Sequence, residues 1–340
     1  MYHYAASDVD FSNKSLDRNE ARNKINYLAS KGQPFVFLID FEGESCFVWS
    51  PDEIDGDRLH FDFGGYTNAP FSRIRKCPRE LKFVKNPVPY PVFLAAYEEV
   101  VSQILAGNSF LVNLTFESEI ETNYSLRELY ECSQANYKLH LDDKMVFFSP
   151  ETFIKIRDGR ISAFPMKGTI DAGIPEAREK ILQNEKETAE HATIVDLIRN
   201  DLSMVANDVA VSRFRYIDKI TTHEKELYQV SSEVTGSLPL GFQNSLGDII
   251  FKLLPAGSIT GAPKAKTTSI IRLVEPHDRG FYTGICGHFD GQNLDSGVMI
   301  RFIEKRGPRF FFKSGGGITC NSEPETEYQE YIDKIYVPIT

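Results

Sequence analysis

Short apolar runs that pair across tight turns recur along this chain, and they constrain its fold more than any other feature. Residues 152–156 and 160–164 flank Asp158-Gly159, a dipeptide typical of two-residue hairpin turns. Residues 35–39 and 46–49 flank a short acidic turn in the same way. Strands joined by such turns run in opposite directions, so the pattern predicts antiparallel sheets.

Helical spacing of apolar residues predicts three main helices. Residues 92–106 form the first and end at Gly107-Asn108, which is typical of a helix C-terminus. Residues 175–206 form the longest, and residues 323–335 form the last, with Pro324 in its first turn. Further strands are expected at residues 109–116, 298–304 and 310–313.

These elements occur in clusters and do not alternate strictly as strand and helix. The pattern favours an α+β fold, one large domain of mainly antiparallel β-sheets packed with outer helices, over a doubly wound sheet. We expect residues 1–340 to form this single domain.

The charge balance limits the partners of such a protein. Lys and Arg number 38 against 48 Asp and Glu, a formal net charge of −10, which argues against a nucleic-acid or anionic-membrane surface. No stretch approaches the roughly 18 apolar residues of a membrane span, and residues 1–10 do not resemble a signal peptide. The five cysteines form no CxxC pair. We therefore expect a cytoplasmic protein with reduced thiols.

Two pairs of glutamates lie on the predicted helices. Glu187 and Glu190 are three residues apart, as are Glu327 and Glu330, so each pair shares one helix face. Four carboxylates converging from two helices would suit Mg²⁺, which prefers oxygen ligands. Either pair alone is more typical of a solvated helix face.

Other residues leave more than one interpretation open. The glycines at 315–317 are either a flexible turn or a stretch whose amides approach a carboxylate. Lys167 is either a surface charge or an amine nucleophile. Residues 257–264 do not have the spacing of a phosphate-binding loop, and Pro263 lacks an N–H that such a loop would use, so we exclude one.

Several long motifs occur in one order along the chain, and together they closely resemble the chorismate-utilising enzymes, the family of anthranilate, aminodeoxychorismate and isochorismate synthases. The resemblance extends from about residue 90 to the C-terminus. The motifs are PMKGT at 165–169, DLIRNDL at 196–202, GSITGAPK at 257–264, GGGI at 315–318 and SEPETEYQE at 322–330.

Lys167 places the resemblance in one branch of that family. Aminodeoxychorismate synthases carry a lysine at this position of the motif, whereas anthranilate synthases carry an alanine. Isochorismate-forming members place a water-activating lysine where this chain has Leu111. The resemblance therefore implies an enzyme that converts chorismate and ammonia to 4-amino-4-deoxychorismate, the precursor of 4-aminobenzoate for folate.

The resemblance also implies a role for each matching residue. Glu190 and Glu330 would hold Mg²⁺ directly, and Glu187 and Glu327 would support it through waters. Lys167 would be the nucleophile and Glu151 the acid or base. The residues implied to bind substrate are Gly168, Thr169, Ser258, Tyr282, Arg301, Gly315, Gly316, Gly317 and Lys334.

The ammonia would come from a separate glutamine amidotransferase subunit, because no glutaminase Cys-His-Glu segment is visible in this sequence. Residues 90–340 would be the catalytic region, and residues 1–85 a shortened strand-rich portion.

Two positions depart from the family pattern: Gln229 stands where many relatives have a histidine, and Leu111 where aminating members have a glutamine. They leave open two alternatives, an anthranilate synthase-like outcome and a catalytically weak chorismate-binding subunit.

Overall fold

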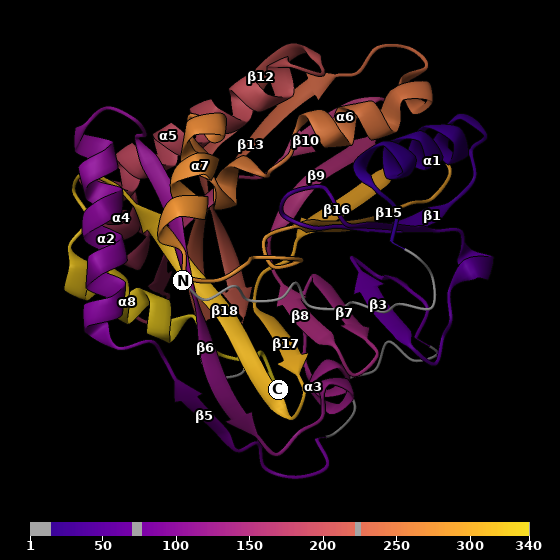
Figure 1. Cartoon of the computed structure of the whole chain (residues 1–340). Coiled ribbons are helices and arrows are strands. Elements are labelled where there is room, and N and C mark those ends of the chain that lie inside the picture. Colours follow the sequence, from indigo (N-terminus) through magenta and orange to yellow (C-terminus); the bar gives the residue numbers. More distant parts are fainter. Residues whose placement is uncertain (1–14, 70–76, 222–225, 340) are drawn as a thin grey trace.

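Two antiparallel β-sheets form the centre of the molecule, with helices outside them (Figure 1). The computed structural model describes residues 15–69, 77–221 and 226–339. Every strand ladder in those ranges is antiparallel, as the hairpin pattern requires. The predicted α+β fold of antiparallel sheets and outer helices is confirmed.

The first sheet has the order β11-β13-β10-β9-β16-β15-β1-β2, and β12 pairs with β13. It contains strands from both ends of the chain, since β1 pairs with β15. The strands are β1 (Phe35–Ile39), β2 (Cys46–Trp49), β9 (Thr152–Arg157), β10 (Arg160–Ala163), β11 (Met166–Asp171), β12 (Asn207–Thr221), β13 (Glu226–Ser237), β15 (Ile285–Phe289) and β16 (Leu294–Val298).

The second sheet has the order β14-β6-β18-β17-β8-β7-β3-β4, and β5 pairs with β6. Its long central ladder joins β6 to β18. The strands are β3 (Leu59–Phe63), β4 (Tyr66–Thr67), β5 (Phe83–Asn86), β6 (Leu111–Thr122), β7 (Tyr137–Leu141), β8 (Met145–Ser149), β14 (Gly261–Ala262), β17 (Phe302–Arg306) and β18 (Arg309–Ile318).

The helices cover the outer faces of the sheets. In Figure 1, α1 and α6 lie over the first sheet, and α2 and α8 lie at the left of the second. The helices are α1 (Arg18–Ser30), α2 (Tyr90–Leu105), α3 (Leu126–Cys132), α4 (Ala177–Gln183), α5 (Glu185–Ser203), α6 (Leu246–Lys252), α7 (Lys264–Val274) and α8 (Pro324–Asp333), with 3₁₀ turns η1 (Pro51–Glu53), η2 (Phe242–Ser245) and η3 (Gly257–Ile259).

The continuous apolar run of β1 reflects burial on both faces. Phe35, Phe37 and Ile39 belong to the hydrophobic cluster that includes the buried face of α1. Val36 and Leu38 belong to a second cluster that includes residues of both sheets. Because both faces of β1 are covered, polar residues do not alternate with apolar ones, and its sequence is uniformly apolar.

The two predicted hairpins are confirmed as β1–β2 and β9–β10. In the second, Asp158 and Gly159 have φ of 51° and 74°, the left-handed values that a type I′ turn requires. The helices predicted near residues 92–106 and 323–335 are α2 and α8. These elements could be predicted because the turn residues and the apolar spacing that define them lie within a few residues of each other in the sequence.

The long helix predicted over residues 175–206 is wrong, because the chain breaks there into α4 and α5. Asn184 ends α4 in an extended conformation and accepts a hydrogen bond from the Glu187 amide, which caps α5. Pro175 and Glu176 precede α4, and Glu176 has φ of 56°, so neither forms the first helical turn.

One further strand prediction needs correction, one open interpretation is decided, and one helix was missed. The strand expected at residues 298–304 is divided between β16 and β17, and the chain crosses from one sheet to the other at residues 299–301. The glycines at 315–317 are not a turn but the end of β18. Helix α1 was not predicted, although Asp17 and Glu20 form a capping box at its start.

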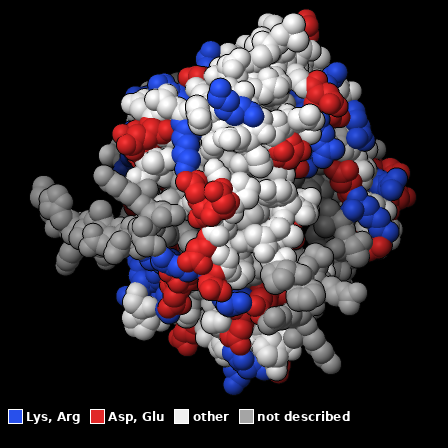
Figure 2. Space-filling view, turned by 90° about the vertical axis from the view of Figure 1, so that its right-hand side faces the viewer, with Lys and Arg blue, Asp and Glu red and all other residues white. Residues whose placement is uncertain are grey.

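The distribution of charged side chains on the surface agrees with the net charge of −10. On the described part of the face in Figure 2, Lys and Arg are interspersed with Asp and Glu and form no continuous basic area. Among the described helices, none combines the length and the apolar character needed to cross a membrane. The signal-peptide prediction concerns residues 1–10, which lie outside the described residues. The assignment of residues 1–340 to a single domain, and its division near residues 85–90, stay predictions.

Candidate active site

One glutamate of the first predicted pair and both of the second face glycines, on one strand of each sheet. A Cβ atom built on Gly168 of β11 would lie 3.1 Å from Glu187 Oε2 of α5. A Cβ on Gly316 of β18 would lie 3.3 Å from Glu330 Oε1 and 3.6 Å from Glu327 Oε2 of α8. Glycine leaves room for these carboxylates, because a larger residue would press against them.

Lys167 connects the two pairs. Its Nζ lies 2.9 Å from Glu190 Oε2 and 4.0 Å from the position of a Cβ on Gly317. Burial favours the neutral amine, but the charges of Glu190, Glu330 and Glu187 outweigh it and raise the pKa of Lys167. The ammonium of Lys167 therefore lies among carboxylates of both α5 and α8.

Lys334 lies on the other side of Glu330. Its Nζ lies 2.5 Å from Glu330 Oε1 and donates a hydrogen bond of 2.9 Å to the Gly315 carbonyl. Burial lowers the pKa of Lys334, and the charges of Arg301 and Lys167 add to this effect. Lys334 is therefore close enough to Lys167 and Arg301 for their charges to act on it.

The donor chemistry around Lys167 fits a divalent cation. Glu187, Glu190, Glu327 and Glu330 offer only carboxylate oxygens, the ligand type that Mg²⁺ prefers. Gly168 and Gly316 lie directly against three of these carboxylates. Among the described residues, no three His, Cys, Asp or Glu side chains are placed to hold a metal as they stand. Two of these carboxylates are instead paired with lysines.

Glu151 and Ser258 form a second part of the site. Ser258 Oγ, in η3, donates a hydrogen bond to Glu151 Oε1 at the start of β9. Burial raises the pKa of Glu151, against the lowering effects of Ser258, Lys334 and Arg301. Both residues line a small pocket of about 30 Å³. Glu151 is thus a half-buried carboxyl that keeps its proton to higher pH than an exposed one.

Arg301 and Tyr282 lie on this side as well. Arg301 is at the crossing between the sheets, with φ of 53°, and its guanidinium lies 4.7 Å from the centroid of the Tyr336 ring. Its Nε is buried and has no hydrogen-bond partner among the described residues. Tyr282 is 4% exposed, and burial raises the pKa of its phenol, with smaller effects from charges that include Arg301 and Glu151. The side chains offer a cationic and a phenolic group beside Glu151.

The glycines of β18 present amides to the site. Gly315 and Gly317 pair with Thr115 and Asn113 of β6. The amides of Thr115 and Asn113 donate to Glu275 and to the Thr260 carbonyl, so neither bonds to β18. In an antiparallel ladder such pairs are the non-hydrogen-bonded ones. The amides of Gly315 and Gly317 therefore point away from β6, and the Gly315 carbonyl accordingly accepts from Lys334.

The structure thus brings most of the sequence-predicted residues into one neighbourhood. Gly168 and Thr169 follow Lys167 in β11, although the Thr169 side chain is outside the described part of the structure. Leu111 lies against Gly317, 3.0 Å from the built Cβ. Gln229, opposite Thr169, donates a hydrogen bond of 3.2 Å to Met166 Sδ.

One buried ion pair was not predicted from the sequence. Lys264 Nζ lies 2.6 Å from Asp201 Oδ2, and it joins the end of α5 to the start of α7. Both residues lie within motifs that were quoted for the resemblance, but neither had a role assigned. Asp201 also packs against Gly257, whose Cβ would lie 3.0 Å from its carboxylate. The pair therefore holds α5 against the turn that carries Ser258.

Comparisons with known proteins agree with this arrangement. A family model described as chorismate binding enzyme matches residues 71–340. An uncharacterized PabA-like protein of Haemophilus influenzae is 47% identical over 316 residues, which cover 93% of this chain and 95% of that protein. Aminodeoxychorismate synthase component 1 of Bacillus subtilis is 32% identical over 72% of this chain and 54% of its own length.

A solved structure of a putative 2,3-dihydroxybenzoate-specific isochorismate synthase from Bacillus anthracis has the same fold. The TM-score is 0.70 at 20% identity, and the match covers 93% of this chain and 86% of that one. The extent of the family match and the high identity to the Haemophilus protein leave no ambiguity about ancestry. The chain belongs to the chorismate-binding enzyme family.

Proposed function

We propose that this protein is an aminodeoxychorismate synthase of the component I type, which converts chorismate and ammonia to 4-amino-4-deoxychorismate for 4-aminobenzoate and folate synthesis. One observation carries the proposal: Lys167 lies among the glutamates of α5 and α8, with Nζ 2.9 Å from Glu190. Overall identity does not distinguish the activities, because anthranilate synthase component 1 of Bacillus subtilis is also 33% identical. Lys167 does distinguish them, because the alanine that anthranilate synthases carry at this position could not form a bond to the substrate.

The carboxylates of α5 and α8 are proposed to hold Mg²⁺. Glu190 and Glu330 would bind it directly and Glu187 and Glu327 through waters. Bound Mg²⁺ would act as a Lewis acid on the ring carboxylate of chorismate. Lys167 and Lys334, which now pair with Glu190 and Glu330, would then be free to face the substrate.

Lys167 is proposed to act as a nucleophile. Its ammonium would first lose a proton to solvent, and the neutral Nζ would then form a bond to ring carbon two while the bond between carbon four and its hydroxyl breaks. Ammonia would then form a bond to carbon four, and the bond to Lys167 would break, which releases the lysine and restores the ring double bonds. Two successive displacements place nitrogen on the carbon that carried the hydroxyl.

Glu151 is proposed to protonate the departing hydroxyl so that it leaves as water. Its burial raises its pKa, which favours the protonated acid that this step requires. The hydrogen bond from Ser258 fixes the carboxyl group in place. Ser258 and Thr169 are proposed to bind the leaving oxygen.

The enolpyruvyl carboxylate of chorismate is proposed to bind on the side of Arg301. The guanidinium fork suits both oxygens of a carboxylate, and its buried Nε lacks a partner among the described residues. The amides of Gly315 and Gly317 and the phenol of Tyr282 would complete the contact. A dianionic substrate is thereby held in a protein of net charge −10 by a few local cations.

Ammonia is proposed to come from a separate glutamine amidotransferase subunit in the cytoplasm. A mixture of this protein with chorismate should then use ammonium salts alone, but should use glutamine only after such a subunit is added.

A second candidate is a catalytically weak chorismate-binding subunit. Leu111 and Gln229 favour it, because Gln229 cannot carry a proton at neutral pH as the family histidine can. Lys167, Glu151 and the four carboxylates oppose it. An anthranilate-type outcome is the third candidate, and Lys167 opposes it.

The substitution Lys167→Ala tests the proposed chemistry. Loss of a nucleophile costs several orders of magnitude, so we expect carbon-four amination to fall at least about 10³-fold, measured by mass spectrometry of the products. Lys155→Ala, which removes a lysine from the ion pair with Asp295 in the first sheet, is the matched control and should retain full activity. Unchanged amination by Lys167→Ala would exclude the covalent step.

A further inference from the structure

Arg279 lies in the loop between α7 and β15, behind the substrate-binding segments and with no role so far. Its side chain and that of Glu275 are each 2% exposed, and they form a two-pronged ion pair. Arg279 Nη2 donates to Glu275 Oε1 at 2.7 Å, and Nε donates to Oε2 at 2.9 Å. This geometry uses two of the five N–H groups of the guanidinium.

The other three N–H groups reach three separate segments. Nη1 donates to the Ile259 carbonyl at 2.9 Å and to Thr283 Oγ1 at 3.3 Å. Nη2 donates its second hydrogen to the Asn113 carbonyl at 2.6 Å. All five donors of this buried guanidinium are therefore satisfied.

Each of these acceptors adjoins a residue proposed to bind substrate. Ile259 follows Ser258 in η3, and Thr283 follows Tyr282. Asn113 is paired with Gly317 across the β6–β18 ladder. One side chain thus connects the three segments that carry the hydroxyl, the phenol and the glycine amides.

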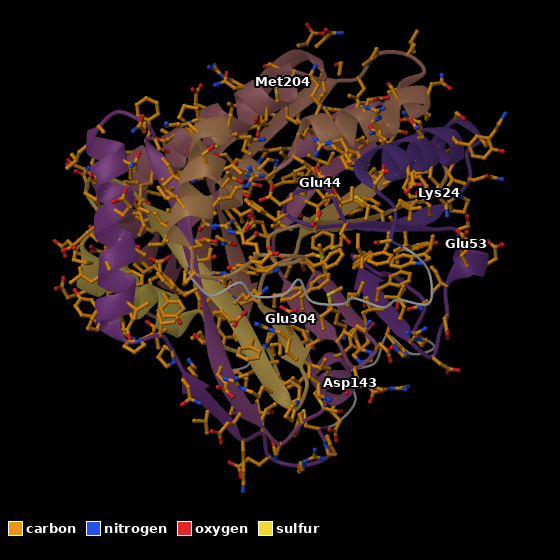
Figure 3. All side chains as sticks on the ribbon, in the orientation of Figure 1. Lys24, Glu44, Glu53, Asp143, Met204 and Glu304 are labelled. Atoms are coloured by element: carbon orange, nitrogen blue, oxygen red, sulfur yellow. The ribbon has the colours of Figure 1, made fainter. Side chains whose placement is uncertain are left out.

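Neighbouring contacts hold the same loop. Glu275 Oε1 also accepts from the amide and hydroxyl of Thr115, which pairs with Gly315. Lys313 of β18 donates to the carbonyls of Asp278 and Arg279, and it lies 2.9 Å from Glu304 of β17, labelled in Figure 3. The loop is therefore fixed against the second sheet from two sides.

We propose that Arg279 is a positioning residue for chorismate binding, which sets the mutual placement of Ser258, Tyr282 and Gly317 without touching the substrate. The proposal rests on the proposed function for the identity of those three groups. The planar guanidinium with five directed donors suits this task, and a lysine ammonium with three donors could not reach all the acceptors. Buried ion pairs often contribute less to stability than to a defined geometry, which agrees with a positioning role.

The test is the Kd for chorismate, measured by isothermal titration calorimetry on wild type and on Arg279→Lys. Loss of charged hydrogen bonds that align three binding groups should weaken binding about tenfold or more. The control is Lys155→Met. It breaks an ion pair in the first sheet, in which Lys155 Nζ lies 2.9 Å from Asp295 Oδ2. It should change the thermal midpoint but leave the Kd for chorismate within about twofold.

A double-mutant cycle with Ser258→Ala separates positioning from simple destabilisation. If Arg279 acts through Ser258, the loss caused by Ser258→Ala should be several-fold smaller in the Arg279→Lys background. Additive losses, or an unchanged Kd in folded Arg279→Lys, would overturn the proposal. Should Arg279→Lys not fold, the double variant Arg279→Gln/Glu275→Gln leaves no unpaired charge and serves the same comparison. If wild type itself does not bind chorismate, the proposed function fails.

Discussion

Lys167 shows how individual charges define this site. Its ammonium lies 2.9 Å from Glu190, and the charges of Glu330 and Glu187 also raise its pKa. Like charges gathered in a half-buried region repel one another strongly, so clustered carboxylates need a cation between them. In the structure that cation is a lysine, and in the proposed enzyme it is Mg²⁺.

Glu330→Ala tests the proposed metal ligand. Loss of one direct carboxylate should raise the Mg²⁺ concentration needed for half-maximal chorismate turnover at least about tenfold while the protein stays folded. The measurement is a Mg²⁺ titration of product formation, with Glu325→Ala in the first turn of the same helix as control. Glu325 accepts a hydrogen bond from Tyr90 and has no proposed role in the site. The same Mg²⁺ requirement in wild type and Glu330→Ala would remove Glu330 from the ligand set.

Asp40 provides a prediction that concerns stability alone. Its carboxylate accepts from the amides of Glu44 and Ser45 in the β1–β2 turn, and burial raises its pKa from 3.8 to about 6. The folded state therefore holds the proton more tightly than the unfolded one. The resulting stabilisation is complete below pH 3.8 and is lost as the pH rises through about 6.

Asp40→Asn should remove this dependence, because the amide oxygen can still accept both bonds and does not titrate. The free energy of unfolding of wild type should fall by about 2.5 kcal/mol relative to Asp40→Asn between pH 4 and pH 7.5. Urea denaturation of both proteins across that range measures the difference. A difference that is constant with pH would show that Asp40 does not titrate there.

At the scale of elements, local signals were predictable and their interruptions were not. The β9–β10 hairpin and helix α2 follow from turn residues and apolar spacing close together in the sequence. The break at Asn184 was missed, because the same residue type fits a helix interior or a cap, and its hydrogen bond to Glu187 decides between them. The glycines of β18 were missed as strand because glycine has a low strand preference by itself.

The glycines of β18 separate stability from activity. A Cβ on Gly315 would lie 2.1 Å from the Leu114 carbonyl, whereas a Cβ on Gly316 would meet only the flexible ends of Glu330 and Glu327. Gly315→Ala should therefore destabilise the protein by about 2 kcal/mol or more, and Gly316→Ala by less than about 1 kcal/mol. Gly316→Ala should instead lower chorismate turnover at least about tenfold by displacing the carboxylates.

Thermal melts and initial rates on both variants make the comparison. Equal stability losses, or full turnover by Gly316→Ala, would contradict the assignment of Gly316 to the site.

At the scale of the whole molecule, the site is assembled from segments distant in sequence. Strand β11 of the first sheet and strand β18 of the second contribute to it, and so do α5, α8 and η3. The spacing of Glu187 and Glu190 predicted a shared helix face but could not place them opposite Glu327 and Glu330, since that depends on how the sheets pack. Only the family resemblance brought these residues together in advance. No role could be assigned to Arg279 from the sequence, because its hydrogen bonds join three segments that are distant in sequence.

The most direct test of the central claim is mass spectrometry of the products formed from chorismate, Mg²⁺ and ammonium at mildly alkaline pH. The account predicts a product in which the ring hydroxyl is exchanged for an amine and the enolpyruvyl group is retained. Anthranilate with release of pyruvate would contradict it. So would unchanged chorismate after a glutamine amidotransferase subunit and glutamine are added.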